Sequence, residues 1–419
     1  MAVNQLSQIF GGNLDLIPHI EERAFMYTMR NYAMASRVTT YTDMTGFNNR
    51  KISEYIRTRR AQDLSEDTAI PDHIINRVRE SSIAPKEVGD RYRISDRRMM
   101  TDLENILSDT IMFLGQAIGD RKEADLIQVA NDSFKLGTIG SESTDFTIDL
   151  PIDGQFVFQQ NAVRDQIYLV VHPFQVKNVV QDLASYRGTD AGVNMNFREQ
   201  SLQGFTIPVF QGLNIAVSEF LPRKLVYKVS VYGTGGTFRL EIGTDQEIGT
   251  TITGEITAAA SGDTTATNIQ TALNALTGQT GWTATATNDD PARITVTAPN
   301  YADAESQLRV AIDIENPTLP SRKSAYDLVT GLSGAPTDNN GDSLGVTVKE
   351  VSGSAKALMF TRDALVYDIR QPVQAFSEME HQGRTMEISA YEKYGVGHWR
   401  DDRGLFIETK ATSPLAVTV

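Results

Sequence analysis

The sequence contains no cysteine among its 419 residues. Disulfide frameworks, cysteine-ligated zinc sites and thiol nucleophiles are therefore excluded, and synthesis in a reducing cytosol is permitted. Histidine is also scarce. The five histidines are His19, His73, His172, His381 and His398, and they form neither an HExxH motif nor a pair spaced by four residues. This distribution gives little support to metal-dependent hydrolysis.

Positive charge is in deficit as well, because 39 Lys and Arg face 53 Asp and Glu, for a formal net charge of -14. Direct binding to a polyanion needs clustered cations that neutralise phosphates, so nucleic acid is not the expected free ligand. No run approaches the roughly 20 apolar residues of a membrane span. The N-terminus also lacks a basic-then-apolar signal sequence. We expect a soluble chain without membrane contact or export processing.

The motifs of common enzymes are missing too. Neither GxxxxGK[ST] nor GxSxG occurs, and GTGG at 233–236 favours a tight turn. The Asp- and Asn-rich stretch at 338–342 resembles a calcium loop but lacks the glutamate at the twelfth position, so we interpret it as a linker. His172 beside an apolar strand is interpreted as a packed core or turn residue. We predict no enzyme, no catalytic, cofactor-binding or metal residues, and no cofactor.

The strongest positive signal is a helix over 101–132. Its apolar residues recur at i, i+3, i+4 and i+7 on one face through Ile118. Thr101 and Glu104 have the spacing of a capping box, which places the start of the helix at Thr101. The phase breaks from Gly119 to Lys122, which predicts a kink or a second short helix.

The chain before this helix is poor in core segments. We interpret residues 1–35 as an arm and residues 36–98 as an extended, loop-rich excursion that needs support from neighbouring subunits. Lys and Arg outnumber Asp and Glu in this excursion, although the whole chain is acidic. We therefore predict that its arginines contact acidic surface on neighbouring subunits. These candidates are Arg57, Arg59, Arg60, Arg77 and Arg79.

Beyond the helix the sequence alternates between strand and helix patterns. A buried strand is predicted at 166–172, a helix begins at Pro173, and two strands follow at 205–210 and 213–217. Residues 226–337 are rich in Thr and acidic, with strands around Leu240 and Leu308 and a helix after Asp263. Linkers at both ends favour a separate small α+β domain. Strands return from Gly345, with a turn at 401–404.

The order of these parts, more than any single motif, carries a family resemblance. The return strand and long helix (YRISDRRMMTDLENILSDTIMFLGQAI), then IYLVVHP, GLNIAVSEFLPR and ALMFTRDALVYDI, and finally ISAYEKYGVGHWRDDRGLFIET resemble a tailed-phage major capsid protein of the Hong Kong 97-like fold. The resemblance covers 1–224 and 341–419. It implies an α+β chain with six parts: 1–35 N-terminal arm, 36–98 extended loop, 99–154 peripheral domain with the spine helix, 155–225 axial domain, 226–340 insertion domain, and 341–419 the remainder of the axial and peripheral domains.

The resemblance implies a non-enzymatic shell subunit that self-assembles into hexamers and pentamers around phage DNA. Its expected location is the virion capsid, after assembly in the host cytoplasm. The expected partners are other copies of the chain, a separate scaffolding protein, a portal and a decoration protein, with little specific contact to the packaged DNA. One family member crosslinks its subunits through a loop Lys and a distant Asn. No motif here identifies partners for Lys51 or Lys86, so that chemistry is not carried over.

Two alternatives remain open at this point. An encapsulin-type cellular nanocompartment would share the fold but enclose no genome. A host- or glycan-binding module formed by residues 226–337 would make the rest of the chain a carrier. The excess of acid in this insert would be repelled by packaged DNA, so we expect the insert on the outer face of a shell.

Overall fold

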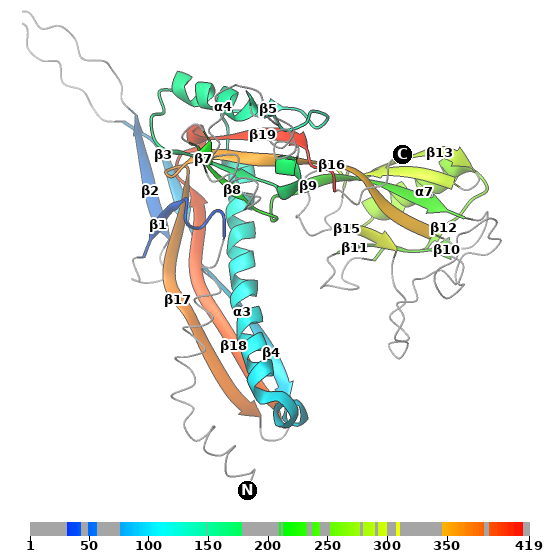
Figure 1. Cartoon of the computed structure of the whole chain (residues 1–419), viewed down its shortest axis with the longest axis horizontal. Helices are drawn as coiled ribbons and strands as arrows, with labels where there is room; N and C mark the ends of the chain where they lie inside the picture. The colour runs from blue at the N-terminus through cyan, green and yellow to red at the C-terminus, as the bar shows by residue number, and fades with distance from the viewer. Residues whose placement is uncertain are drawn as a thin grey trace, which may run out of the picture.

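The computed structural model describes the chain in thirteen segments: 32–42, 49–56, 76–147, 149–177, 209–210, 213–232, 237–243, 252–276, 280–289, 292–299, 307–310, 346–380 and 385–413. Figure 1 shows a body built from two sheets and a long helix, with a smaller lobe projecting to one side. The predicted arm at 1–35 lies almost wholly outside the described residues. So do the GTGG turn and the calcium-like stretch.

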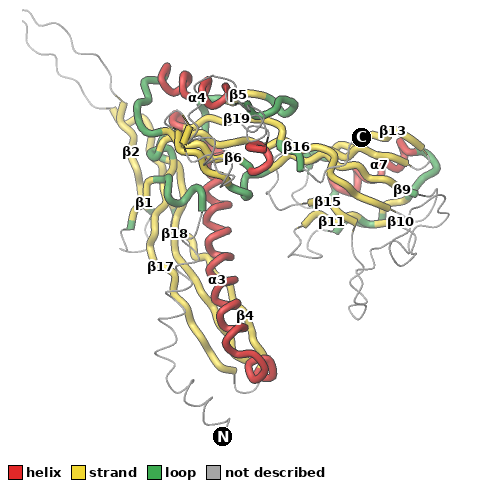
Figure 2. The backbone as a smooth tube through the Cα atoms, viewed as in Figure 1, coloured by secondary structure: helices red, strands yellow, loops and turns green. Residues whose placement is uncertain are grey.

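The lower part of the body is helix α3 (Asp96–Ser133) packed along a four-stranded sheet. The sheet order is β1 (Thr39–Tyr41), β17 (Leu365–Glu380), β18 (Thr385–His398) and β4 (Lys86–Ser95). Ile111, Leu114 and Ile118 of α3 share a core with Ile388 of β18 and its buried neighbours. Figure 2 shows the helix following the strands along their length. The apolar stripe predicted from the sequence is therefore the face that contacts the sheet.

Helix α3 corrects two details of the sequence prediction. It begins at Asp96, directly after β4, so the proposed capping box lies inside the helix. It also continues without interruption through Gly119–Lys122, and its 38 residues give a length of about 57 Å. The apolar phase breaks there because Lys122, Glu123 and Asp125 are buried against polar partners, and Gly119 lies against the ring of Tyr32.

The upper part of the body belongs to a nine-stranded sheet. Its main path runs β13 (Thr283–Asp289), β14 (Ala292–Thr297), β9 (Arg223–Val231), β16 (Val346–Thr361), β6 (Ile167–Val171), β8 (Leu213–Val217) and β7 (Val209–Phe210). Strand β19 (Gly404–Lys410) pairs with β16 and with β5 (Thr138–Gly140). Strands β6 and β8 confirm two predicted strands. The predicted turn after β18 is a short 3-10 helix, η2 (Asp401–Arg403).

Helix α4 (Asp149–Gln160) packs on this sheet, in a region where the sequence pattern is ambiguous. Phe158 is fully buried among residues of β6, β16 and β19. A Cβ added at Gly154 would stand 2.5 Å from the sulfur of Met359, so the helix approaches β16 closely at that glycine. The proposed boundary between residues 154 and 155 lies inside this helix.

The projecting lobe has a hydrophobic core of its own. Helix α7 (Gly262–Asn274) confirms the predicted helix after Asp263, and its Ile269 and Leu273 are fully buried there. Two short strand pairs complete the lobe, β10 (Thr237–Phe238) with β12 (Ile256–Thr257) and β11 (Leu240–Gly243) with β15 (Gln307–Val310). The core also includes Leu225 and Val346, so β9 and β16 belong to the body and to the lobe at once.

The outer edge of β13 is covered rather than open. Asn274 of α7 accepts a hydrogen bond from Trp282 N at 2.9 Å and donates one to Trp282 O at 2.9 Å. Gln270 accepts from Ala284 N at 3.1 Å. Because a sheet edge with unpaired backbone groups attracts other strands, these two side chains protect the lobe against pairing at this position. Within the described residues, no helix is both long and apolar enough to cross a membrane.

Candidate assembly surfaces

A β-hairpin leaves the body on the side opposite the lobe (Figure 1). Its strands, β2 (Arg50–Ile56) and β3 (Asn76–Ile83), pair with each other in a separate two-stranded sheet. An isolated two-stranded hairpin has only marginal stability in water. The ring of Tyr55 near the far end of β2 is 58% exposed. The hairpin therefore presents unused contact surface.

Close packing of one side chain fixes the base of the hairpin to the body. Ile83 is 1% exposed and lies on β18 at Gly395 and Gly397. A Cβ at Gly395 would stand 2.7 Å from Ile83 Cγ2, and one at Gly397 would stand 2.6 Å from Ile83 Cγ1. These distances are too short for real side chains, so the two glycines form the flat seat that Ile83 occupies.

Charge completes the hairpin root. Arg50 Nε lies 3.0 Å from Asp368 Oδ2, and Arg370 Nε lies 2.8 Å from the same oxygen. Asp368 is 1% exposed, and the guanidinium of Arg50 lies 4.4 Å from the centre of the Tyr41 ring. A buried carboxylate is costly to leave unpaired, so Asp368 depends on these two arginines. The hairpin root, defined here as Arg50, Ile83, Asp368, Gly395 and Gly397, thus determines where the hairpin leaves the body.

Only two of the five arginines predicted to contact neighbouring subunits lie within the described residues. Arg57, Arg59 and Arg60 lie outside the described residues. Arg77 and Arg79 lie on β3, opposite Tyr55 and Glu54 of β2 in the backbone register of the two strands. No contact between subunits tests these five residues, so their role stays a prediction. The sequence reasoning missed the hairpin root, although the closely spaced glycines in YGVGH were a usable signal for a close approach within a strand.

Helix α3 is connected to the rest of the body by a buried row of polar residues, Lys122, Glu123 and Asp125, called here the polar row. Lys122 Nζ lies 2.6 Å from Glu392 Oε2 on β18, and Tyr367 OH of β17 donates to Glu392 Oε1 at 2.9 Å. Tyr394 OH donates to Asp125 Oδ2 at 2.6 Å. Burial, followed by the adjacent carboxylates, raises the pKa of both tyrosines, so both hydroxyls remain protonated donors.

Glu123 ties the last residues of the predicted arm to the body. It is fully buried and accepts hydrogen bonds from Ala33 N at 3.1 Å, Met34 N at 3.0 Å and Ser218 Oγ at 3.1 Å. Burial raises the pKa of the Glu123 carboxyl, and the hydrogen bonds from Met34, Ser218 and Ala33 oppose that shift. The single carboxylate joins α3, residues 33–34 and the end of β8.

Exposed aromatic side chains mark further candidate contact surfaces. Phe376 on β17 is 48% exposed and stacks on Tyr391 of β18, with ring centroids 5.3 Å apart and an interplanar angle of 2°. This pair lies on the four-stranded sheet. Tyr92 of β4 and Phe113 of α3 form a second exposed pair, 6.3 Å apart. Aromatic residues are enriched in protein–protein interfaces.

The described residues contain no group of His, Asp and Glu side chains arranged to hold a metal ion. His172 is buried, and its Nδ1 accepts a hydrogen bond from Phe174 N at 3.1 Å. Burial and, secondarily, the nearby charge of Arg223 lower the pKa of His172 to about 3. This matches the interpretation of His172 as a packed residue at a turn.

No family model matches the chain, and no curated protein matches it. Solved structures do match it. It is similar to the capsid structure of cyanophage P-SCSP1u, with 11% identity, a TM-score of 0.46, and coverage of 92% of this chain and 90% of that one. It is similar to the acid-stable capsid structure of Helicobacter pylori bacteriophage KHP30, with 7% identity, a TM-score of 0.45, and coverage of 89% and 88%. A virus-like particle from Pyrococcus furiosus matches at 8% identity, a TM-score of 0.42, and coverage of 94% and 99%.

The described elements follow one another in the order that the sequence predicts. A rooted hairpin is followed by a long helix on a four-stranded sheet, then by a second sheet. The chain returns from the projecting lobe to complete both sheets. The α+β class is likewise confirmed.

Replacing Gly397 by alanine tests the hairpin root. We expect Gly397→Ala to destabilise the chain by about 1–3 kcal/mol, because the new methyl group overpacks against Ile83. Ile83→Ala removes the clashing atoms, so the double variant should be more stable than the sum of the two single effects predicts. Urea unfolding of the four proteins measures this coupling. Strict additivity would show that Ile83 does not occupy the glycine seat.

Removing the carboxylate of Glu123 tests the polar row. Glu123→Ala leaves two backbone N–H groups and the Ser218 hydroxyl without their acceptor, so we expect a loss of about 3 kcal/mol in the free energy of unfolding. Glu123→Gln keeps an oxygen acceptor and removes a buried charge, so its loss should be much smaller. Thermal or urea unfolding measures both variants. Equal losses would contradict the role of Glu123 as a hydrogen-bond acceptor.

Acidification tests the burial of His172. The pKa of this residue is about 3 in the folded chain and about 6.5 when unfolded, so the unfolded state binds more protons between these values. Its contribution to stability is therefore present above pH 6.5 and is lost as pH falls, with a slope of about 1.4 kcal/mol per pH unit. His172→Gln should lack this contribution. Parallel pH profiles of the two proteins would contradict the buried, neutral state.

Proposed function

We propose that this chain is a major capsid protein that self-assembles into the icosahedral shell around a tailed-phage genome. The observation that carries the proposal is the rooted hairpin, β2–β3. It is firmly attached at Ile83 and Arg50, yet its strands pair only with each other in the described chain. A neighbouring subunit supplies the surface that a single chain does not provide.

The four-stranded sheet offers a suitable partner surface. Exposed Phe376, stacked on Tyr391, supplies apolar contact area, and exposed Tyr55 supplies a matching aromatic group on the hairpin. In the proposed shell the hairpin of one copy lies across this sheet of the next. Repetition of one such contact around a ring gives hexamers and pentamers, because head-to-tail contacts close when the rotation permits.

The remaining partners belong to the same proposal. A separate scaffolding protein guides assembly, a portal and a decoration protein join the shell, and the virion capsid is the final location after assembly in the host cytoplasm. The role is structural rather than enzymatic. The net charge of -14 supports enclosure of DNA with little specific contact. The acidic insert at 226–340, which includes the projecting lobe, faces outward.

Electron microscopy of the purified chain tests the shell. We expect closed particles or ring-shaped precursors, with or without co-expressed scaffolding protein, because the hairpin needs a partner surface. Stable monomers by light scattering at every concentration and in both settings would contradict the proposal. A map with the insert on the inner surface would overturn its proposed orientation alone.

The same particles distinguish the alternatives. Shells isolated from a phage lysate with packaged DNA would reject an encapsulin-type compartment, whereas DNA-free shells carrying a cellular enzyme would favour it. Glycan binding by the full chain that is lost on substitution of exposed insert residues would instead favour a host-binding module.

Charge reversal tests the predicted arginine contacts of the hairpin. We expect Arg77→Glu with Arg79→Glu to reduce the yield and rate of particle formation, because complementary charge mainly determines register and association rate. The free energy of unfolding of the unassembled chain should change by less than about 0.5 kcal/mol. A matched control reverses two exposed arginines of the lobe, Arg239 and Arg293. Equal assembly defects in both pairs would refute the specific role of the hairpin.

A further inference from the structure

The lobe is connected to the body by a continuous β-ribbon. Strands β9 and β16 pair antiparallel from Arg223↔Ala355 in the body to Val231↔Val346 in the lobe. The register shifts between Glu350 and Ser352, so a bulge interrupts the ribbon between its two ends. Bulges bend a strand and increase its local twist. The bulge is therefore the position at which the direction of the lobe relative to the body is set.

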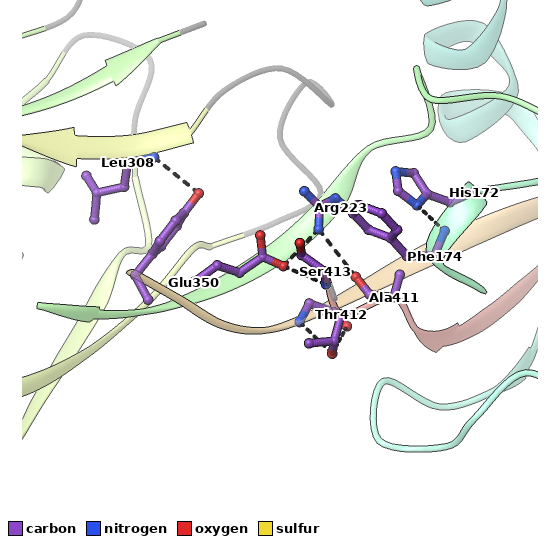
Figure 3. A network of polar contacts seen from close by, with 10 residues as sticks. His172, Phe174, Arg223, Leu308, Glu350, Ala411, Thr412 and Ser413 are labelled. Carbon is purple, nitrogen blue, oxygen red and sulfur yellow. Dashed lines mark hydrogen bonds and ion pairs between the residues drawn. The ribbon is translucent and has the colours of Figure 1, made fainter. Parts of the chain in front are cut away.

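Residues 411–413 lie against this bulge. Ala411 N donates to Gly353 O at 2.6 Å, Gly353 N donates to Thr412 Oγ1 at 3.3 Å, and Ser413 N donates to Glu350 Oε1 at 3.1 Å. Figure 3 shows these residues gathered beside β16. A Cβ at Gly353 would stand 2.8 Å from Ala411 O, so the close approach depends on glycine. The C-terminal segment thus bonds to the ribbon on both sides of the register shift.

Arg223 connects the same segment to the body. Its Nη1 lies 2.9 Å from Glu350 Oε1 and donates to Ala411 O at 3.4 Å. The guanidinium also lies 4.8 Å from the centre of the Phe174 ring. The Arg223 side chain is 7% exposed, so this charge depends on its partners for compensation. One buried cation therefore contacts the ribbon, the C-terminal segment and the body segment after β6.

The ribbon is attached on its lobe side as well. Tyr227 of β9 accepts a hydrogen bond from Leu308 N of β15 at 3.1 Å, and its ring belongs to the lobe core. Burial raises the pKa of Tyr227 to about 12, with a further increase from the charge of Glu350. The ribbon is therefore fixed inside the lobe by Tyr227, which pairs with Glu350 at the bulge, and inside the body by Arg223, with residues 411–413 beside the bulge (Figure 3).

We propose that residues 411–413 form a brace that sets the angle between the lobe and the body, with the Arg223–Glu350 ion pair as its fastening. At the bulge β9 also pairs with β14, through Tyr227↔Val296 and Val226↔Thr297. The brace adds contacts on β16, because residues 411–413 continue past the last β19–β16 pair, Lys410↔Ser354. Release of the brace would widen the range of angles between lobe and body while both cores stay folded. The proposal concerns a single chain, so it does not depend on shell formation.

A distance measurement across the joint tests the brace. The chain contains no cysteine, so Gln159→Cys on α4 and Thr285→Cys on β13 provide two unique, exposed sites for spin labels. Electron–electron resonance then gives the distribution of distances between body and lobe in the full chain. Labelled protein is diluted into an excess of unlabelled chain, so that signals between copies in any assembly are suppressed.

The decisive comparison uses two truncations. A chain ending at Lys410 lacks the brace, and a chain ending at Ser413 keeps it. We expect the first to show a broadened and shifted distance distribution and the second to match the full chain. Unchanged distributions in both truncations would overturn the proposal. Equal broadening in both would also overturn it, because residues beyond Ser413 would then control the angle.

A point variant covers the case in which the shorter chain fails to fold. Glu350→Ala removes the acceptor shared by Arg223 and Ser413 without shortening the chain. We expect it to broaden the distribution, whereas Lys349→Ala, at an exposed neighbouring position on β16, should leave it unchanged. A narrow distribution in Glu350→Ala, or the same broadening in Lys349→Ala, would refute the fastening role of the ion pair.

Discussion

The burial of charged residues on one turn of α3 is the constraint on which the body depends. Lys122, Glu123 and Asp125 are at most 5% exposed. Lys122 and Asp125 contact β18, and Glu123 contacts residues 33–34 and Ser218 after β8. Buried charges are costly unless they are paired and hydrogen-bonded, so the helix has one arrangement in which all three are satisfied. That arrangement places α3 against β17 and β18 below and against the end of β8 above. The two sheets of the body thereby acquire a defined relation to each other through a single helix.

The β2–β3 hairpin and the lobe are attached to the body by similar contacts. At the hairpin root, Ile83 occupies a glycine seat beside the Arg50–Asp368 pair. Where the lobe joins the body, Ala411 approaches Gly353 beside the Arg223–Glu350 pair. At both points, a glycine lets two chain segments approach closely. The ion pair beside it fixes their relative orientation. A rigid body with firmly rooted extensions suits a subunit whose extensions meet other copies, because pre-organisation lowers the entropic cost of association.

The sequence predicted elements better than it predicted their connections. The apolar stripe of α3 can be recognised in the sequence because its partners on β17 and β18 are apolar. The stripe ended at Gly119 only because the next contacts are polar and come from residues 33, 218 and 392, which no local pattern connects to the helix. Helix α4 was ambiguous because its burial depends on Met359, far along the chain. The two glycines of the seat signal a close approach within a strand, but strand alternation does not indicate that their partner is Ile83.

The central claim is that β2–β3 is completed by another copy of the chain, and amide hydrogen exchange tests it most directly. Exchange is followed by mass spectrometry in the unassembled chain and in purified particles under the same conditions. Since marginally stable elements open readily, we expect rapid exchange in 50–56 and 76–82 before assembly and strong protection afterwards. Residues 110–130 of α3 should be protected in both states. Equal exchange of the hairpin in the two states would contradict the claim, because its strands would then gain no partner on assembly.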